Sequence, residues 1–342
     1  MEKLKQILNS LMDCLSLSGH ELYGESTIKA LAEGICDEIK TDNMGTFLLI
    51  KKSARENAPK LLIDAHYDTV GLMVTGIKKG GFLSITSVGG LDTNILPSTE
   101  VTVYGKEKVY GIITSTPPHL RSGEPKSPKM DGLYIDTGYS KEKIEELVSI
   151  GDPVVFKNTV DYINGDYVTS AYLDDKACLC SALDALSKMD KDQMEFDIYL
   201  TASAQEETGK CGVARVAFDI EPDLAVITDV NFAKTEDDES FECIEAGKGA
   251  SIDISAVTNR RISKNIMKYL TSEGIEYQVC CEPGATSTNA DFVSISGQGV
   301  PTVLMSVPLK SMHTPSETVN LRDIKSLSEI LVKIAYHKDI LN

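Results

Sequence analysis

Hydrophobic residues recur at helical spacing near both ends of the chain. Residues 4–15 carry apolar side chains three or four positions apart and predict an amphipathic helix that ends near Ser18 and Gly19. A second helical pattern covers residues 28–39 and leads into a turn-rich link at residues 41–45. Residues 324–334 repeat the same spacing, so a further amphipathic helix is expected there.

Short apolar runs between these helices predict buried strands. They share a high content of β-forming residues and polar boundaries: residues 47–50, 61–65, 196–204, 224–229 and 295–307. Helical patterns, such as the one following Asp174 and Asp175, alternate with these runs. This alternation predicts an α/β fold, in which helices flank a central mixed sheet.

The pattern changes for nearly a hundred residues after Gly71. Short β-like runs at residues 82–86, 101–104 and 110–113 are separated by glycines, and a polar loop begins at Thr116 and includes His119. Many short strands with frequent turns favour a small β-barrel or sandwich. The expected organisation is therefore a discontinuous catalytic domain, residues 1–69 and 166–342, with an inserted β-rich domain at residues 70–165.

Composition narrows the classes of partner and compartment. The formal net charge is -17 over 342 residues, and no run of lysine and arginine offers a basic face for nucleic acid or an anionic membrane. The eight cysteines match no zinc-finger spacing and are expected to be reduced thiols in a cytoplasmic protein. No signal peptide and no membrane-spanning run is predicted.

Metal-capable side chains follow several of the predicted strands. Five places along the chain carry them: His66, Asp174, Glu206 with Glu207, Asp229 and His313. Each alone has an ordinary interpretation, such as a solvated acidic pair or a carboxylate at a helix start. Together they form the ligand set of a two-metal hydrolase, because carboxylates and imidazoles around two divalent ions can bind a shared water. The other histidines, His20, His119 and His337, have no comparable acidic neighbours in the sequence and are expected to be structural or surface residues.

These segments resemble a known family, the dinuclear-metal aminopeptidases of the glutamyl and tetrahedral types, some of which have carried endoglucanase labels. The matching segments are residues 64–71, 173–176, 205–209, 228–230 and 312–317. The resemblance covers essentially the whole chain. It implies a zinc-peptidase-like catalytic domain with an inserted small β-barrel, and a homo-oligomer that could be a dodecamer.

The resemblance also implies a role for each site residue. Asp174 would bridge two divalent ions, with His66 and Asp229 on one ion and Glu207 and His313 on the other. Asp68 would lie near His66, behind the metal ligands, and support the catalytic site. Glu206 would be the general base for a metal-activated water that removes N-terminal residues from short peptides. Zinc is the expected metal, with cobalt or manganese as alternatives.

Three positions depart from the family pattern. Lys176 and Lys310 stand where arginine is expected, and Asn289 stands in place of an aspartate. Lysine cannot make the planar bidentate contact of arginine, so substrate preference or subunit contacts could differ.

Alternative functions are a related carboxypeptidase or amide deacylase, a glycosidase, and a non-catalytic assembly protein with a decayed site.

Overall fold

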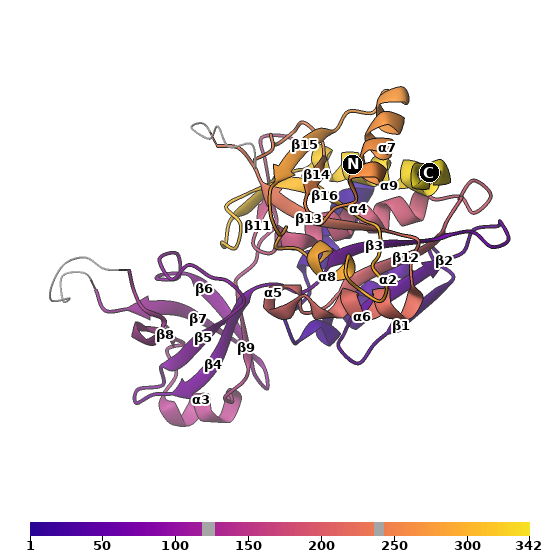
Figure 1. The fold of residues 1–342 in the computed structure, drawn as a ribbon. Helices are drawn as coiled ribbons and strands as arrows, with labels where there is room; N and C mark the ends of the chain where they lie inside the picture. Colours follow the sequence, from indigo (N-terminus) through magenta and orange to yellow (C-terminus); the bar gives the residue numbers. More distant parts are fainter. Residues whose placement is uncertain (118–126, 236–242) are drawn as a thin grey trace.

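A computed structural model describes residues 1–117, 127–235 and 243–342 of the chain. Within these residues, eleven strands form one mixed sheet, and a closed barrel of six antiparallel strands lies beside it (Figure 1). The α/β fold with a central mixed sheet and a small barrel is therefore confirmed. None of the described helices has the length and apolar character needed to cross a membrane.

The large sheet has the strand order β1-β2-β12-β3-β13-β16-β17-β11-β10, and β14 and β15 extend it beside β16. Its strands are β1 (Glu38–Thr41), β2 (Phe47–Lys51), β3 (Lys60–His66), β10 (Asp161–Ile163), β11 (Tyr167–Ser170), β12 (Asp197–Ser203), β13 (Leu224–Phe232), β14 (Ser251–Ser255), β15 (Gln278–Glu282), β16 (Thr302–Lys310) and β17 (Glu317–Asn320). The four central strands β12, β3, β13 and β16 run parallel to one another. Their carboxyl ends therefore share one edge of the sheet.

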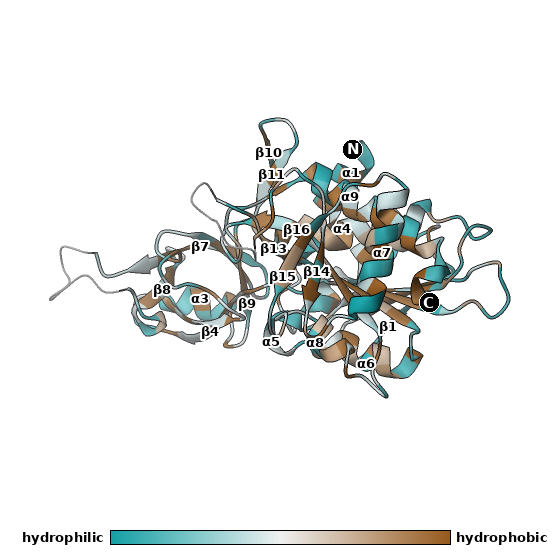
Figure 2. Ribbon diagram, turned by 45° about the horizontal axis from the view of Figure 1, so that its top comes forward, coloured by the Kyte–Doolittle hydropathy of each residue, from teal (hydrophilic) through white to brown (hydrophobic). Residues whose placement is uncertain are grey.

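Helices cover both faces of this sheet. They are α1 (Glu2–Met12), α2 (Glu25–Ala32), α4 (Leu173–Lys188), α5 (Glu206–Gly209), α6 (Cys211–Ile220), α7 (Arg260–Ser272), α8 (Ala290–Val293) and α9 (Leu321–Ala335), with short 3-10 turns η1 (Glu21–Gly24) and η4 (Lys338–Leu341). Successive strand residues point to opposite faces, so Leu61 and Ile63 join the core under α1, α4 and α9, whereas Leu62 packs with α6 and α8. Figure 2 shows these apolar strands between the helices.

The barrel is formed by β4 (Gly71–Ile77), β5 (Leu83–Val88), β6 (Glu100–Tyr104), β7 (Lys108–Ser115), β8 (Leu133–Asp136) and β9 (Pro153–Phe156), with η3 (Met130–Gly132) and α3 (Lys141–Leu147) attached. Strand β7 alternates buried and exposed residues, and Val109 and Ile113 point into the barrel core. Strand β10 already pairs with β11 in the large sheet. The barrel strands thus lie between Gly71 and Phe156.

Two helix predictions were too long. The N-terminal helix ends at Met12, because the chain then turns so that Leu17 can bridge to Thr69. Helix α2 ends at Ala32, and Gly34 adopts a left-handed conformation that stops helical growth. The predicted helical residues near Ile39 instead form β1, which pairs with β2. Pairing with the sheet edge overrides the local helical spacing there.

Two further expectations concern the loops. The last buried strand was predicted to include Ile295, but it begins only at Thr302, and the Ile295 side chain is exposed. Periodicity alone cannot distinguish the short helix α8 and its following turn from the start of a strand. The polar loop after Thr116 contains His119, which lies outside the described residues.

Candidate metal centre

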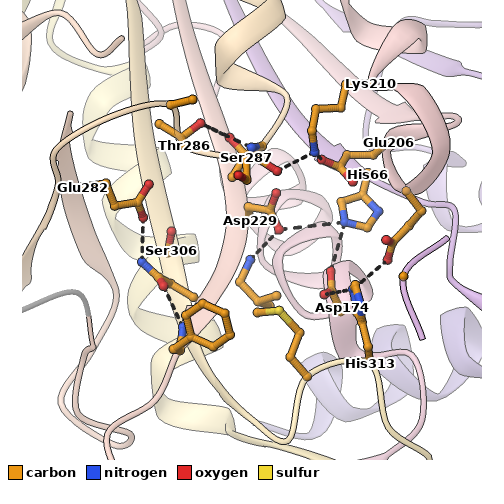
Figure 3. Close-up of a pocket in the computed structure, with 18 of the residues that line it drawn as sticks. His66, Asp174, Glu206, Lys210, Asp229, Glu282, Thr286, Ser287, Ser306 and His313 are labelled. Carbon is orange, nitrogen blue, oxygen red and sulfur yellow. Dashed lines mark hydrogen bonds and ion pairs between the residues drawn. The ribbon is translucent and has the colours of Figure 1, made fainter. Parts of the chain in front are cut away.

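The candidate site lies where the carboxyl ends of the parallel strands meet. His66 ends β3, Asp229 lies near the end of β13, and Glu206 and Glu207 begin α5 directly after β12. Asp174 lies in the first turn of α4, and His313 lies in the loop between β16 and β17. Figure 3 shows the labelled side chains of this set converging from separate elements: His66, Asp174, Glu206, Asp229 and His313. Ligands of open α/β sheets bind at this edge, because loops there enclose a crevice.

Two groups of three side chains share Asp174. In the first group, His66 Nε2 lies 3.0 Å from Asp174 Oδ1 and 3.8 Å from Asp229 Oδ1. In the second, His313 Nε2 lies 3.3 Å from Asp174 Oδ2 and 3.3 Å from Glu207 Oε1. Within each group the candidate ligand atoms lie within 4.8 Å of one another. The two oxygens of Asp174 therefore face different groups.

The ring of His66 is oriented by the backbone. Its Nδ1 lies 2.9 Å from the carbonyl oxygen of Asp68. A carbonyl oxygen can only accept a hydrogen bond, so Nδ1 carries the proton and donates it. Nε2 thereby faces Asp174 and Asp229, and a bound metal ion would take the place of a proton on this nitrogen.

The carboxylate of Asp68 positions the glutamate pair. Its two oxygens accept hydrogen bonds from the backbone N–H groups of Glu206, at 2.9 Å, and Glu207, at 3.1 Å. N–H groups at the start of a helix have no acceptor within the helix, and the fully buried carboxylate of Asp68 supplies one for both. The side chain predicted to assist His66 thus also fixes the position of the turn that carries Glu206 and Glu207.

Glu317 links two of the site's loops, and sequence reasoning gave it no role. Its carboxylate accepts hydrogen bonds from the backbone N–H groups of Asp174, at 3.1 Å, and His313, at 2.7 Å. It is almost completely buried, and burial together with the nearby Asp174 raises its pKa to about 8. The signal in the sequence was its position four residues after His313, at the start of β17.

The pKa values show how strongly the site concentrates negative charge. Burial alone would lower the pKa of His313, but its contacts with Asp174 and Glu207 raise it to about 11. Burial raises the pKa of Glu207 to about 7 and the pKa of Asp229 well above its ordinary value. Although burial also opposes its ionisation, hydrogen bonds from His313 and His66 lower the pKa of Asp174. Such a buried excess of carboxylates favours bound cations.

The donor set fits a pair of divalent ions. Each group offers one imidazole nitrogen and carboxylate oxygens, which are ligands that zinc and related transition metals accept. Glu207 Oε1 is buried and receives no hydrogen bond from the described residues, although His313 Nε2 is 3.3 Å away. A buried carboxylate oxygen that receives no hydrogen bond is suited to bind a cation. The residues present are therefore compatible with two metals bridged by Asp174.

Glu206 has a partner that the sequence reasoning missed. Lys210, four residues later, forms an ion pair with Glu206 Oε1 and also donates to the backbone carbonyl of Ser287. Figure 3 shows this chain of contacts above His66. A Glu and a Lys four residues apart often pair on a helix, so the spacing was the available signal.

These groups line a cavity of about 820 Å³. Its lining joins the two candidate metal groups to Glu206 and Lys210, and it continues along residues 229–232 and 282–288. A volume of this size accommodates a small ligand or the end of a peptide.

The three departures from the family pattern lie outside this cavity lining. Lys176 is buried, donates to the carbonyl of Cys14 at 3.2 Å, and lies 5.6 Å from the ring centroid of Tyr67. Asn289 donates to Asp64 Oδ2 at 2.8 Å and to Ser203 Oγ at 3.0 Å.

The other departure, Lys310, and two further histidines, His20 and His337, also lie apart from the site. Lys310 is exposed at the end of β16. His337 stacks on Tyr269 with ring centroids 3.9 Å apart, and the ring of His20 lies 6.1 Å from that of Tyr23. Neither histidine lines the cavity.

An α/β sheet that gathers imidazoles and carboxylates in a crevice at its carboxyl edge has the layout of a metal-dependent hydrolase. The chain belongs to the M42 glutamyl aminopeptidase family, whose model matches residues 45–330. This membership makes it a peptide hydrolase of a metal-dependent family.

Relatives of known name match nearly the whole chain. A lysyl aminopeptidase of Pyrococcus furiosus is 30% identical over 326 residues, which cover 93% of each chain. The aminopeptidase APDkam598 from the archaeon Desulfurococcus kamchatkensis has a TM-score of 0.93 at 26% identity, with 100% of this chain and 97% of that chain covered. The TET1 peptidase of Pyrococcus horikoshii, which can assemble into a tetrahedron or a large octahedral shell, has a TM-score of 0.86 at 28% identity, with 98% and 99% covered.

Proposed function

We propose that the protein is a dinuclear metalloaminopeptidase that removes N-terminal residues from short peptides. One observation carries the proposal: two groups of ligand atoms share Asp174, and Glu206 lies beside them in the same cavity. Asp174 would bridge the ions, His66 and Asp229 would hold one, and Glu207 and His313 would hold the other. Zinc is the proposed metal, with cobalt or manganese as alternatives, because mixed carboxylate and imidazole sites accept all three.

The chain's own residues suggest how the reaction proceeds. Two bound divalent ions would polarise the scissile carbonyl and lower the pKa of water. Glu206 would accept a proton from the attacking water and pass it to the leaving amine, acting first as general base and then as general acid. Asp68 would keep Glu206 in place through the backbone of α5, and it would keep Nε2 of His66 turned toward the site through its own carbonyl.

Substitution of Glu206 tests the assigned base. Glu206→Gln keeps the five proposed ligands, so bound metal should remain unchanged by elemental analysis. We expect kcat on aminoacyl-nitroanilides to fall by about a hundredfold to ten-thousandfold, since a positioned proton acceptor typically contributes that much. Glu221→Gln, at the exposed far end of α6, is the control and should retain activity. Undiminished turnover by the Glu206 variant would refute the role.

Substrates with blocked termini separate this proposal from a carboxypeptidase or an amide deacylase. An aminopeptidase requires a free α-amino group, so N-acetylated substrates should be inert and C-terminal amides should be cleaved. Preference for N-acylated substrates would favour the deacylase, and dependence on a free C-terminal carboxylate would favour the carboxypeptidase. Full activity in the presence of a chelator would exclude the metal-dependent mechanism altogether.

We also propose a cytoplasmic homo-oligomer, possibly a tetrahedral dodecamer, in which residues 70–165 form an oligomerisation domain and residues 1–69 and 166–342 form the catalytic domain. The assemblies of the TET1 relative support the oligomer. The cysteines form no disulfide within the described residues, which suits a reducing compartment. Light scattering that gives a monomeric mass would contradict the oligomer, and recovery in a secreted fraction would contradict the location.

A further inference from the structure

The turn that carries Glu206 begins in an uncommon backbone conformation. Gln205, between β12 and α5, has φ 58° and ψ 32°, in the left-handed region that residues other than glycine rarely adopt. Such a conformation persists where contacts with the surrounding structure impose it. Because Gln205 directly precedes Glu206, its two backbone angles set the direction in which the Glu206 side chain leaves the end of the strand.

The contact that holds Gln205 comes from the N-terminal part of the chain. The backbone N–H of Gln205 donates to Glu21 Oε1 at 3.1 Å, across 184 residues of sequence. The same oxygen accepts the backbone N–H of Gly19 at 2.9 Å. Glu21 is 2% exposed, and burial raises its pKa to about 7. One buried carboxylate oxygen therefore joins an N-terminal loop to the turn that bears Glu206.

Glu21 has little room to move. Gly45, in the link between β1 and β2, has φ 93°, and a Cβ atom added there would lie 3.1 Å from Glu21 Cβ. The preceding segment is also fixed, because Ser18 donates its backbone N–H to the carbonyl of Thr69 at 3.0 Å and its hydroxyl lies 2.8 Å from Thr208 Oγ1. The N-terminal loop therefore contacts the chain just after β3 as well as α5 itself.

Two buried carboxylates together fix three successive peptide planes. Asp68 accepts the N–H groups of the two glutamates that follow Gln205. Glu21 accepts the N–H of Gln205 itself. The rigid peptide planes on both sides of the Gln205 Cα atom are thus held by side chains, so its two angles are fixed while both contacts remain. Without Glu21, the first plane is released, and relaxation of Gln205 toward a right-handed conformation would displace Glu206.

We propose that Glu21 is a positioning residue, which keeps Glu206 aligned for proton transfer by holding the backbone of Gln205. The inference rests on the proposed aminopeptidase function, in which Glu206 is the general base, and it adds a residue that does not touch the substrate. Glu21 lies behind the site and is not part of the cavity lining. A displacement of about 1 Å at a catalytic group can cost about a hundredfold in rate, so support from behind the site affects kcat.

A series of substitutions at Glu21 tests the assignment with aminoacyl-nitroanilides. Glu21→Met removes the acceptor and Glu21→Asp draws it back by one methylene, so we expect kcat to fall about tenfold to a hundredfold in both, with KM and bound metal nearly unchanged. Glu21→Gln should stay within about threefold of wild type, because both N–H groups use one oxygen and an amide carbonyl can replace it. Should Glu21→Met fail to fold, Glu21→Asp gives the same comparison.

A double-mutant cycle distinguishes positioning from a general structural role. If Glu21 acts through Glu206, Glu21→Met should cause no further loss of kcat in the Glu206→Gln background. A purely structural role would lower kcat by the same factor in both backgrounds. Asp323→Asn is the matched control, because Asp323 is also buried and accepts two backbone N–H groups from a distant segment. It should lower Tm and leave kcat unchanged.

Hydrogen exchange provides a readout that is independent of turnover. The peptide that contains Gln205 should exchange faster in Glu21→Met than in the wild-type protein or in Glu21→Gln. This inference is wrong, while the aminopeptidase proposal survives, if folded Glu21→Met has wild-type kcat, loses bound metal in parallel with activity, or lowers kcat further in the Glu206→Gln background. No hydrolysis of any free-amine substrate by the wild-type protein would instead overturn the proposed function.

Discussion

At the scale of single residues, the contact between Lys210 and Glu206 is the main ion pair at the proposed proton acceptor. The proposed proton acceptor is buried, yet it has a cationic partner from its own helical segment. Lys210 also contacts the carbonyl of Ser287, so it connects the turn bearing Glu206 to the loop that follows β15. Lys210 is about one quarter exposed, with 23% of its side chain accessible, which limits how far water can screen the pair.

Replacement of Lys210 should therefore affect the chemical step more than binding. Lys210→Met removes the donor that holds Glu206 in place, and we expect kcat to fall by about tenfold with KM nearly unchanged. Lys210→Arg should recover part of the loss, because it restores a cationic donor. Lys29→Met removes an ion pair with Glu25 of the same i,i+4 spacing on the outer face of α2 and serves as the control in steady-state kinetics. A wild-type kcat for Lys210→Met would show that the pair does not position Glu206.

At the scale of elements, the site depends on contacts that connect loops rather than on the strands alone. Asp68 holds the start of α5, and Glu317 holds the start of α4 and the loop that carries His313. Asp174 itself has non-helical backbone angles, with φ -76° and ψ 113°, although it lies in the first turn of α4. Because the first N–H groups of a helix have no intrahelical acceptor, the N–H of Asp174 is available to Glu317. These buried carboxylates set the relative position of three ligand-bearing segments.

Glu317→Gln tests this element-level role. Glutamine has one carbonyl oxygen, so it can serve only one of the two N–H groups well and turns an NH₂ toward the other. We expect metal affinity to fall by about tenfold to a hundredfold, as for other residues that orient metal ligands. The measurement is a competition titration with a chromophoric chelator, and Glu329→Gln, on the exposed face of α9, is its control. Unchanged affinity in a folded variant would limit Glu317 to a structural role.

At the scale of the whole molecule, the site connects several elements of the catalytic part of the chain. Its proposed ligands come from segments as far apart in the chain as His66 and His313, so cations bound there would connect β3, α4, α5, β13 and the loop after β16. They would also relieve repulsion among the buried carboxylates. Metal binding and global stability should therefore be coupled.

Chelation should lower the thermal stability of the protein. A ligand at a hundred times its Kd stabilises the folded state by about 2.7 kcal/mol, so removal of metal should reduce Tm measurably, and added zinc, cobalt or manganese should restore it. The test is calorimetry before and after dialysis against a chelator. Asp174→Asn loses the charge of the shared carboxylate, so its Tm should respond little to metal. Equal Tm values for stripped and reloaded wild-type protein would argue against the site.

Much of this structure follows from short-range patterns in the sequence. The apolar runs at residues 61–65, 196–204 and 224–229 predicted buried strands, because a strand buried on both faces needs apolar residues throughout. The frequent glycines after Gly71 likewise predicted a small β domain. Where the sequence reasoning failed, at β1 and at Ile295, local periodicity was compatible with both a helix and a strand, and pairing with β2 or the position of β16 made the difference.

What the sequence determined alone is the set of residue types that could bind metal, together with the strands and helix starts that carry them. The tertiary structure decided which atoms face one another: that Asp174 turns one oxygen to each group, that Asp68 binds the backbone N–H groups at the start of α5, and that Glu317 binds the backbone N–H of Asp174. The physical reason is that these contacts join residues far apart in the chain. Their geometry depends on strand order, register and loop path, which no local pattern encodes.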